Sequence, residues 1–340
     1  MGGSVALALR EQGWRVTGFD VDEACVDDAL RRGVIDEVGV AEDAVVTFVA
    51  IPASATSVVV REMLARTSGI VTDVASVKLR VVAGIDDPRF VGGHPMAGSE
   101  QEGLAGSDGE MFVGAVWVLT PNETTADATV ALVANIARSF GADVVAIAAD
   151  RHDEIVAVVS HVPHLTAAAL MSLAERRSVD HVALLRLAAG GFRDMTRVAA
   201  GHPAIWPDIC VENRDAIVAV LDGLVSELSR MRDVVAAEDR DAILGTLTNA
   251  RAARTNLPGR ATQPADLVEM RIPIPDRPGA AGEVFTLAGE LDVNIFDFEV
   301  AHSPEGDLGV MIVVIAAAKT DLLRGGLVAR GFRPGIRDLA

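Results

Sequence analysis

Over the first part of the chain, short apolar runs typical of strands alternate with segments in which apolar residues recur at helical spacing. Short apolar runs typical of buried strands lie at 45–51, 69–74, 116–119 and 142–147. Segments 22–32 and 54–66, between them, repeat apolar residues at helical spacing. Strands that alternate with helices of this length predict a doubly wound parallel α/β sheet, which we expect to end near residue 148.

The pattern changes in the second half of the chain. From 149 to 256 we find no strand pattern, and apolar residues recur at helical spacing, which predicts an all-helical domain suited to dimerisation. Residues 257–265, which include Pro258, Gly259 and Pro264, predict a linker. From 266 to 340 the patterns follow the order β-α-β-β-α-β, typical of a small ferredoxin-like domain.

The chain starts within the second half of a dinucleotide-binding fingerprint. A helix pattern follows Gly2 at once, and a short strand over 14–20 ends in the acidic Asp20. The full fingerprint of a Rossmann-like fold has a strand and G-x-G-x-x-G before this helix and an acid about 20 residues on. Gly2 therefore matches its last glycine, and Asp20 matches the acid that binds the ribose. The first strand and the first two glycines are missing, which either a misassigned start or a real truncation would explain. We expect NAD and not NADP, because Val21 and Asp22, not an arginine, follow Asp20.

Composition narrows the classes of partner. The formal net charge of −18 over 340 residues argues against nucleic acid and anionic membranes. The longest apolar runs stop well short of the ~20 residues that span a bilayer. The two cysteines, Cys25 and Cys210, have no metal-ligand spacing. We therefore expect a soluble protein of the reducing cytoplasm without a metal site.

The stretch GGHPMAGSE at 92–100 holds the leading candidate for chemistry, His94. It follows an apolar pair that is typical of a short buried strand, and ligands of open α/β sheets bind past the carboxyl ends of such strands. Pro95 biases His94 toward an extended backbone. The glycines at 92, 93 and 98 suggest that the backbone passes close to a ligand.

Four stretches in a fixed order carry a family resemblance: TDVASVK at 72–78, GGHPMAGSE at 92–100, SHVPHL at 160–165 and GGFRDMTR at 190–197. By these stretches the chain resembles the prephenate dehydrogenases of tyrosine biosynthesis that carry a C-terminal ACT domain. The resemblance covers the whole chain except the missing first strand. It implies a homodimeric, NAD-dependent enzyme that oxidises and decarboxylates prephenate to 4-hydroxyphenylpyruvate.

The resemblance also implies roles for single residues. It makes His94 the group that takes the hydroxyl proton and Ser76 a hydrogen-bonding group beside it, although Ser76 also fits a helix N-cap. Arg197 is implied to bind a substrate carboxylate through its planar guanidinium. The residues implied to line or order the substrate pocket are His164, Glu100, Gly190, Arg193, Asp153 and Trp206. Those implied to line the cofactor site are Gly2, Gly3, Asp20, Ile51, Pro52 and Ser76.

The ACT resemblance rests on 276–279 and 292–295, where Asp276 and Asn294 match positions that contact an amino-acid effector. The ACT domain could also serve only dimerisation. Two other functions stay open. One is arogenate (cyclohexadienyl) specificity, for which His164 is the discriminating residue. The other is a non-catalytic amino-acid sensor on a degraded nucleotide fold, against which the intact set of His94, Ser76 and Arg197 counts.

Overall fold

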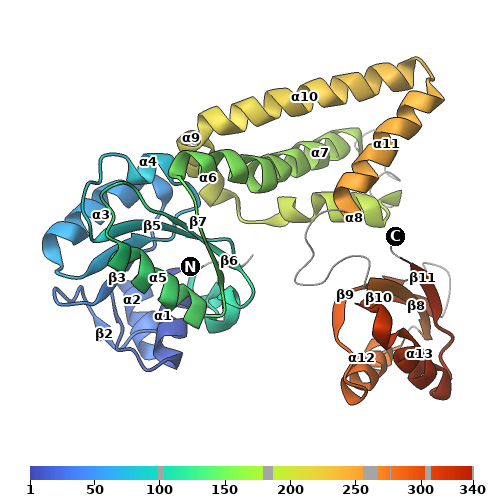
Figure 1. Cartoon of the computed structure of the whole chain (residues 1–340), viewed down its shortest axis with the longest axis horizontal. Coiled ribbons are helices and arrows are strands. Elements are labelled where there is room, and N and C mark those ends of the chain that lie inside the picture. Colours follow the sequence, from blue (N-terminus) through green and yellow to red (C-terminus); the bar gives the residue numbers. More distant parts are fainter. Residues whose placement is uncertain are drawn as a thin grey trace. The chain divides into compact units, whose positions relative to one another are not determined.

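The computed structural model describes residues 1–98, 101, 103–178, 187–255, 267–275, 277–302 and 308–338. It comprises two compact units, Met1–Leu228 and Ser229–Ala340, which we treat separately (Figure 1). The expected linker at 257–265 and the candidate residues Glu100 and Asp276 lie outside the described residues. The division between the units falls within one helix, α10 (Arg214–Ala236), so the expected domain ends near 148 and 256 stay predictions.

A five-stranded sheet with the order β3-β4-β5-β6-β7 forms the centre of the first unit. Its strands are β3 (Val46–Val49), β4 (Ile70–Asp73), β5 (Phe90–Pro95), β6 (Val116–Thr120) and β7 (Asp143–Ala146). The pairings β3–β4, β4–β5 and β6–β7 are parallel, whereas β5–β6 is antiparallel. The expected α/β sheet is confirmed, with this one antiparallel pairing.

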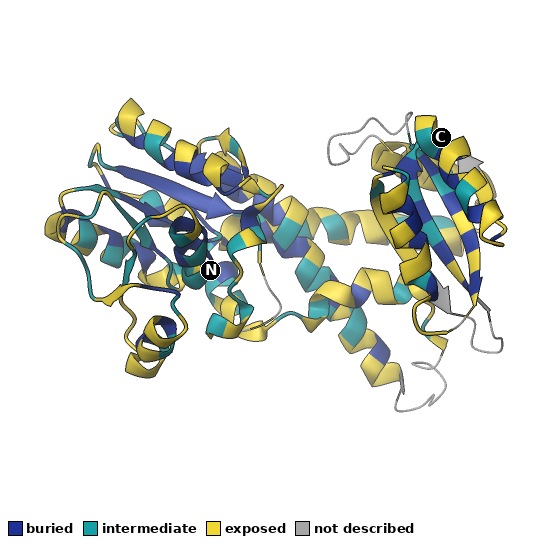
Figure 2. Cartoon of the chain, turned by 90° about the horizontal axis from the view of Figure 1, so that it is seen from below, coloured by how far each residue is buried: buried dark blue, intermediate teal, exposed yellow. Residues whose placement is uncertain are grey.

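Helices cover both faces of this sheet, and its middle strands β4, β5 and β6 are the buried centre of the unit (Figure 2). On one face α1 (Gly2–Glu11) and α5 (Asp127–Ser139) pack around Trp117. On the other face α3 (Ala53–Arg66) packs around Phe90. The apolar side of α2 (Glu23–Arg31) packs beside α1. Helices α1, α2 and α3 lie where the sequence pattern predicted them, whereas α5 was not predicted.

Strand β1 (Thr17–Gly18) pairs in parallel with β2 (Glu37–Val38) in a sheet of their own. The strand expected over 14–20 is therefore only two residues long. Within the described residues no strand precedes α1, and none joins this pair to the five-stranded sheet. The expected first strand stays a prediction.

The remainder of the first unit and the start of the second are helical, as the sequence predicted. The helices are α6 (Ala149–Val156), α7 (Val162–Ser178), α8 (Gly190–Thr196), α9 (Trp206–Glu212), α10 and α11 (Arg240–Thr255). By length and composition alone, the continuous stretch Ala149–Arg177 could cross a membrane, with a mean hydropathy of 1.5. Two of its polar residues, His152 and Asp153, are buried and hydrogen-bonded to residues of the sheet domain, and 28% of the apolar window is buried.

The second unit holds an antiparallel four-stranded sheet with the order β11-β8-β10-β9. Its strands are β8 (Leu267–Pro275), β9 (Ile295–His302), β10 (Leu308–Ala316) and β11 (Gly335–Asp338). Helices α12 (Ala280–Glu290) and α13 (Thr320–Ala329) bury their apolar sides against β8 and β10. This chain order and strand order confirm the expected ferredoxin-like arrangement.

Candidate active site

His94 lies on β5 itself and not in a loop beyond the strand, because β5 continues through Pro95 and pairs with β6. The glycines before it permit close packing within the protein. A Cβ on Gly93 would lie 2.5 Å from the carbonyl oxygen of Asp73, and one on Gly92 would lie 2.4 Å from Oγ1 of Thr120. Gly92 and Gly93 therefore do not make room for a ligand but let β5 fit between its neighbours, whereas a Cβ on Gly98 would meet open space, so the approach to a ligand stays a prediction there.

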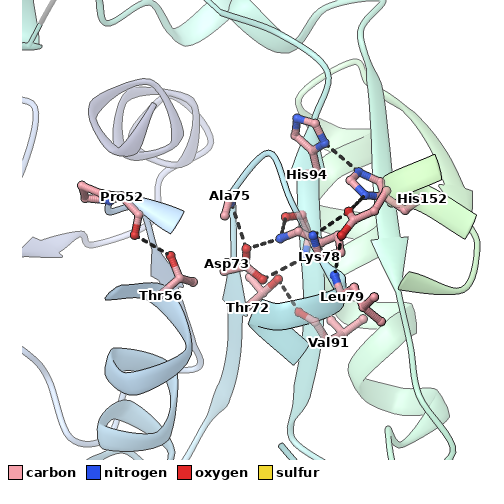
Figure 3. A network of polar contacts seen from close by, with 12 residues as sticks. Pro52, Thr56, Thr72, Asp73, Ala75, Lys78, Leu79, Val91, His94 and His152 are labelled. Carbon is pink, nitrogen blue, oxygen red and sulfur yellow. Dashed lines mark hydrogen bonds and ion pairs between the residues drawn. The ribbon is translucent and has the colours of Figure 1, made fainter. Parts of the chain in front are cut away.

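His94 is the first member of a buried chain of hydrogen bonds (Figure 3). Nδ1 of His94 lies 2.8 Å from Nε2 of His152, and Nδ1 of His152 lies 2.7 Å from Oδ1 of Asp153. The exposed fractions are 8% for His94, 0% for His152 and 3% for Asp153. The chain thus joins a strand of the sheet to α6, with hardly any access for water.

Asp153 also caps the short helix α4 (Leu79–Val82) from outside. Its Oδ1 accepts the backbone N–H of Lys78 at 2.8 Å, and its Oδ2 accepts that of Leu79 at 2.9 Å. The reading of Ser76 as the N-cap was wrong, because the N-cap is Lys78 and the capping carboxylate comes from α6. Ser76 is half-buried and makes no side-chain hydrogen bond within the described residues, so its contact with a substrate hydroxyl stays a prediction.

Lys78 is a fully buried cation close to His94. Its Nζ donates to the carboxylate of Asp73 and, at 2.7 Å, to the carbonyl oxygen of Gly93. Lys78 and Asp73 are both 0% exposed. Burial lowers the pKa of Lys78, and the negative charge of Asp73 opposes that shift. Lys78 therefore anchors the backbone directly before His94 and adds a positive charge nearby.

The environment of His94 favours its neutral form. Burial is the largest cause that holds the pKa of His94 well below its ordinary 6.5, and the neighbouring His152, Lys78 and His161 lower it further. At neutral pH His94 is therefore an uncharged imidazole that can accept a proton.

A π-helical turn, Ala157–His161, joins α6 to α7 and ends in His161, and His164 follows in the first turn of α7. Pro163 follows the π-helical turn and has no backbone N–H to donate to the preceding turn, which accounts for the local change of pitch. His161 is buried, lies 3.1 Å from Nδ2 of Asn213 through its Nδ1, and has its pKa lowered by burial to about 4. His164 is half-buried and stacks on Trp206 with ring centroids 3.6 Å apart.

The residues expected to bind substrate carboxylates lie on α8 and just after it. Gly190 is the first residue of α8, and Nε of Arg193 donates to the carbonyl oxygen of Ala188 at 3.2 Å. Arg197 is exposed and begins a 3-10 turn that packs against α7, the helix of His164. A Cβ on Gly191 would meet open space, so the close backbone approach to a ligand that the glycine pair suggests stays a prediction.

The residues expected to bind a dinucleotide lie at two helix starts and at the end of a strand. Gly2 and Gly3 begin α1, whose first turn has no side-chain cap. Asp20 is exposed beyond β1, and Ile51 and Pro52 lead from β3 into α3, which also lacks a side-chain cap. Uncapped helix N-termini favour phosphate, and an exposed carboxylate suits ribose hydroxyls, so these residues fit a dinucleotide.

Sequence reasoning missed His152 and gave Lys78 no role. The only signal for His152 was an adjacent His-Asp pair ahead of SHVPHL, and its partner His94 lies 58 positions away, beyond any periodic pattern. In the second unit Asn294 is exposed in the connection between α12 and β9. Its expected effector contact stays a prediction.

The fold and this site define the chain as a dehydrogenase that uses a dinucleotide. Residues 5–146 match the family model "Prephenate dehydrogenase, nucleotide-binding domain", and residues 148–249 match "Prephenate dehydrogenase, dimerization domain". The prephenate dehydrogenase of Bacillus subtilis is 32% identical over 330 residues, which cover 92% of this chain and 88% of that protein. The chain belongs to the prephenate dehydrogenase family.

Solved structures agree with this assignment. Prephenate dehydrogenase of Aquifex aeolicus, solved with hydroxyphenyl propionate and NAD+, matches with a TM-score of 0.69 and 29% identity, covering 75% of this chain and 93% of that one. Arogenate dehydrogenase of Synechocystis matches with a TM-score of 0.63 and 27% identity, covering 74% of this chain and 94% of that one.

Proposed function

We propose that the chain catalyses the NAD-dependent oxidation and decarboxylation of prephenate to 4-hydroxyphenylpyruvate. Membership of the family supports the reaction, and the Aquifex aeolicus relative, solved with NAD+ and hydroxyphenyl propionate, supports this pairing of cofactor and ring-bearing acid. The observation that carries the proposal is His94, a buried neutral histidine with one ring nitrogen held by the protein.

The reaction needs a base for the ring hydroxyl as its carbonyl develops. Nδ1 of His94 is engaged by His152, so Nε2 is the nitrogen that meets the hydroxyl. The lowered pKa keeps the ring of His94 neutral at neutral pH, so one ring nitrogen can take a proton, and a base so placed contributes roughly 10²- to 10⁴-fold. NAD, when bound, accepts the hydride. The ring carboxylate leaves as CO2, the ring becomes aromatic, and its oxygen regains a proton as a phenol.

Recognition of the two carboxylates of prephenate falls to α8 and its surroundings. Arg197 offers a planar fork that binds a carboxylate through two hydrogen bonds. Gly190 and Arg193 belong to α8, which ends directly before Arg197. The resemblance also assigns Glu100, outside the described residues, to substrate binding. The stacked rings of His164 and Trp206 provide a flat wall for the substrate.

The cofactor is NAD rather than NADP in this proposal. The carboxylate of Asp20 accepts hydrogen bonds from free ribose hydroxyls and repels a 2′-phosphate. Gly2, Gly3, Ile51 and Pro52 would meet the rest of the dinucleotide at the helix starts.

An assay of NADH formation by the purified chain with prephenate tests the proposal. His94→Asn should lower kcat by about 10²-fold or more with little change in KM, because only the transition state loses its base. His202→Asn makes the same change at an exposed histidine and should keep wild-type kcat. Wild-type protein that makes no NADH from prephenate would overturn the proposal, and full activity in folded His94→Asn would overturn the role of His94.

Arogenate is the second candidate substrate, supported by the likeness to the Synechocystis arogenate dehydrogenase. Arogenate carries an amino group where prephenate has a keto group. Burial lowers the pKa of His164, so its ring is neutral at pH 7 and can donate a hydrogen bond to a keto oxygen. A neutral ring can also accept a hydrogen bond from the amino group of arogenate, so the expectation of a higher kcat/KM for prephenate rests on the 32% identity to the Bacillus subtilis prephenate dehydrogenase. A higher value for arogenate would reverse the order of the two candidates.

We also propose a homodimer formed by the helical domain. Val218, Val225 and Leu228 are exposed on α10 at helical spacing, and they offer an apolar stripe to a second copy. Light scattering should give twice the chain mass for the wild type and the single chain mass for Val225→Glu. A monomeric wild type would contradict this part of the proposal.

The second unit is proposed to bind an aromatic amino acid through Asp276 and Asn294. The exposure of Asn294 supports this role, since its amide can meet an α-carboxylate. Coupling of ~1–3 kcal/mol would change apparent substrate affinity by about 5- to 150-fold. Calorimetry with each aromatic amino acid should show binding that Asn294→Ala weakens. Equal binding to both proteins, or none, would leave dimerisation as the role of this unit.

A further inference from the structure

We infer that His152 and Asp153 fix the tautomer of His94. While the substrate ring is oxidised, they also hold one proton in exchange for the proton that His94 takes from the substrate hydroxyl. This inference rests on the proposed function, because it assigns the path of the hydroxyl proton in that reaction. Both are positioning residues: they lie behind His94, away from the nitrogen that meets the substrate, and act through its ring.

The direction of each hydrogen bond follows from Asp153. An ionised carboxylate only accepts, and Asp153 already accepts the backbone N–H groups of Lys78 and Leu79. Nδ1 of His152, 2.7 Å from Oδ1 of Asp153, therefore carries the hydrogen. With its single hydrogen on Nδ1, His152 presents the lone pair of Nε2, so Nδ1 of His94, at 2.8 Å, is the donor.

The consequence for His94 is a fixed tautomer. With the hydrogen on Nδ1, its Nε2 carries a lone pair and can act as the base. An isolated neutral imidazole exchanges between two tautomers, and the second, with the hydrogen on Nε2, cannot take a proton from the substrate. The same logic, a carboxylate that orients a histidine, operates in serine proteases. Here a second histidine, His152, lies between the carboxylate of Asp153 and the candidate base His94.

The proton is borrowed and not consumed, because the ring oxygen that loses it ends as a phenol. As Nε2 of His94 takes the hydroxyl proton, Nδ1 of His94 releases its own proton to Nε2 of His152. The positive charge then lies on His152, against the carboxylate of Asp153. When the aromatic oxygen regains a proton, both transfers reverse and both histidines end neutral. One O–H bond has broken and one has formed.

The surrounding charges favour this location for the proton. A proton that stayed on His94 would be buried near the ammonium of Lys78 and the ring of His161, both of which lower the His94 pKa. The carboxylate of Asp73 is already paired with Lys78. On His152 the same proton meets the carboxylate of Asp153. The amide of Asn213, which donates to the carbonyl oxygen of Asp153, adds no charge.

Nitrogen NMR of the free, full-length chain tests the tautomers without substrate. Of the seven histidines, His94 and His152 should both show a protonated Nδ1 and an unprotonated Nε2, assigned by comparison with single-histidine variants. In His152→Gln, whose carbonyl can still accept from His94, the His94 tautomer should persist. In His152→Leu it should become mixed. Protonation of His94 at Nε2 in the wild type would overturn the inference, whatever the substrate of the enzyme proves to be.

Steady-state kinetics then test whether His152 holds the proton during the reaction. His152→Gln keeps an acceptor for His94 but cannot carry a proton, so we expect kcat to fall about 10²-fold with KM unchanged within about threefold. The fall of kcat on the acid side of the pH profile should begin at a lower pH, because only His94, whose protonation is disfavoured, remains to be protonated. His202→Gln is the matched control. If the folded His152→Gln variant keeps the wild-type kcat and the wild-type pH profile on the acid side, His152 does not hold the proton. A wild type inactive on prephenate would overturn only the proposed function, since the NMR result decides the tautomer separately.

Discussion

Replacing Lys78 with methionine should destabilise the first unit by about 3 kcal/mol. Removal of one partner from a buried ion pair typically costs ~3–5 kcal/mol, because the other charge is left buried and unpaired. Here Asp73 would keep two backbone donors, Ala75 N–H at 2.9 Å and Gly93 N–H at 3.3 Å, which places the expected loss at the lower end. Asp73→Asn in the same chain removes the stranded charge, so the double variant should recover most of the loss.

Urea unfolding followed by tryptophan fluorescence measures this loss. All three tryptophans lie within residues 1–228, and Trp117 is 0% exposed in the same sheet, so the signal reports the unit that holds the pair. Arg15→Met is the control, since it breaks an ion pair with Glu37 whose side chains are 76% and 56% exposed. Such a pair contributes about 0–1 kcal/mol. A loss below about 1 kcal/mol for Lys78→Met, or a double variant less stable than either single one, would refute the reasoning.

Three further predictions concern single residues. Arg197→Ala should raise KM for prephenate by roughly 30- to 1000-fold through loss of a charge-assisted bond, and an unchanged KM in steady-state assays would remove Arg197 from the site. The pKa of His161 is about 4, below its unfolded value near 6.5, so between these values the unfolded chain binds a proton that the folded chain does not. Stability should therefore fall by about 3 kcal/mol as pH drops from 6.5 to 4, and His161→Gln should flatten this fall in urea midpoints. Asp20→Asn should narrow the preference for NAD over NADP by about tenfold in measured Kd values, and an unaltered ratio would show that Asp20 does not meet the ribose.

The sequence predicted the order of elements well, because each depends on local signals. The helix of α1 is followed by Gly13 at a φ of 82°, and Asp22 caps α2 with its own side chain. The candidate base His94 was also found locally, through its place after an apolar strand. Such signals come from neighbouring residues, so they can be recognised without knowing how distant parts of the chain pack.

The sequence failed where a local feature is completed by a distant residue. The start of α4 was misplaced because its capping carboxylate, Asp153, comes from another part of the chain. Gly92 and Gly93 were expected to bring the backbone close to a ligand, but the space beside them is filled by Thr120 and Asp73. These contacts depend on how β5 sits between β4 and β6, which no pattern within β5 encodes.

Asp153 caps α4 and reaches His94 through His152, yet both residues belong to the helical stretch that follows the sheet in the chain. During synthesis, the sheet domain leaves the ribosome first and can fold before α6 has emerged. At that stage α4 lacks its cap, and the ring of His94 has no fixed orientation. A nascent chain that ends before α6, or one from which a protease has removed the helical part, would therefore lack the partners that orient His94. The alignment of the candidate base is a property of the sheet and α6 together, and not of the sheet alone.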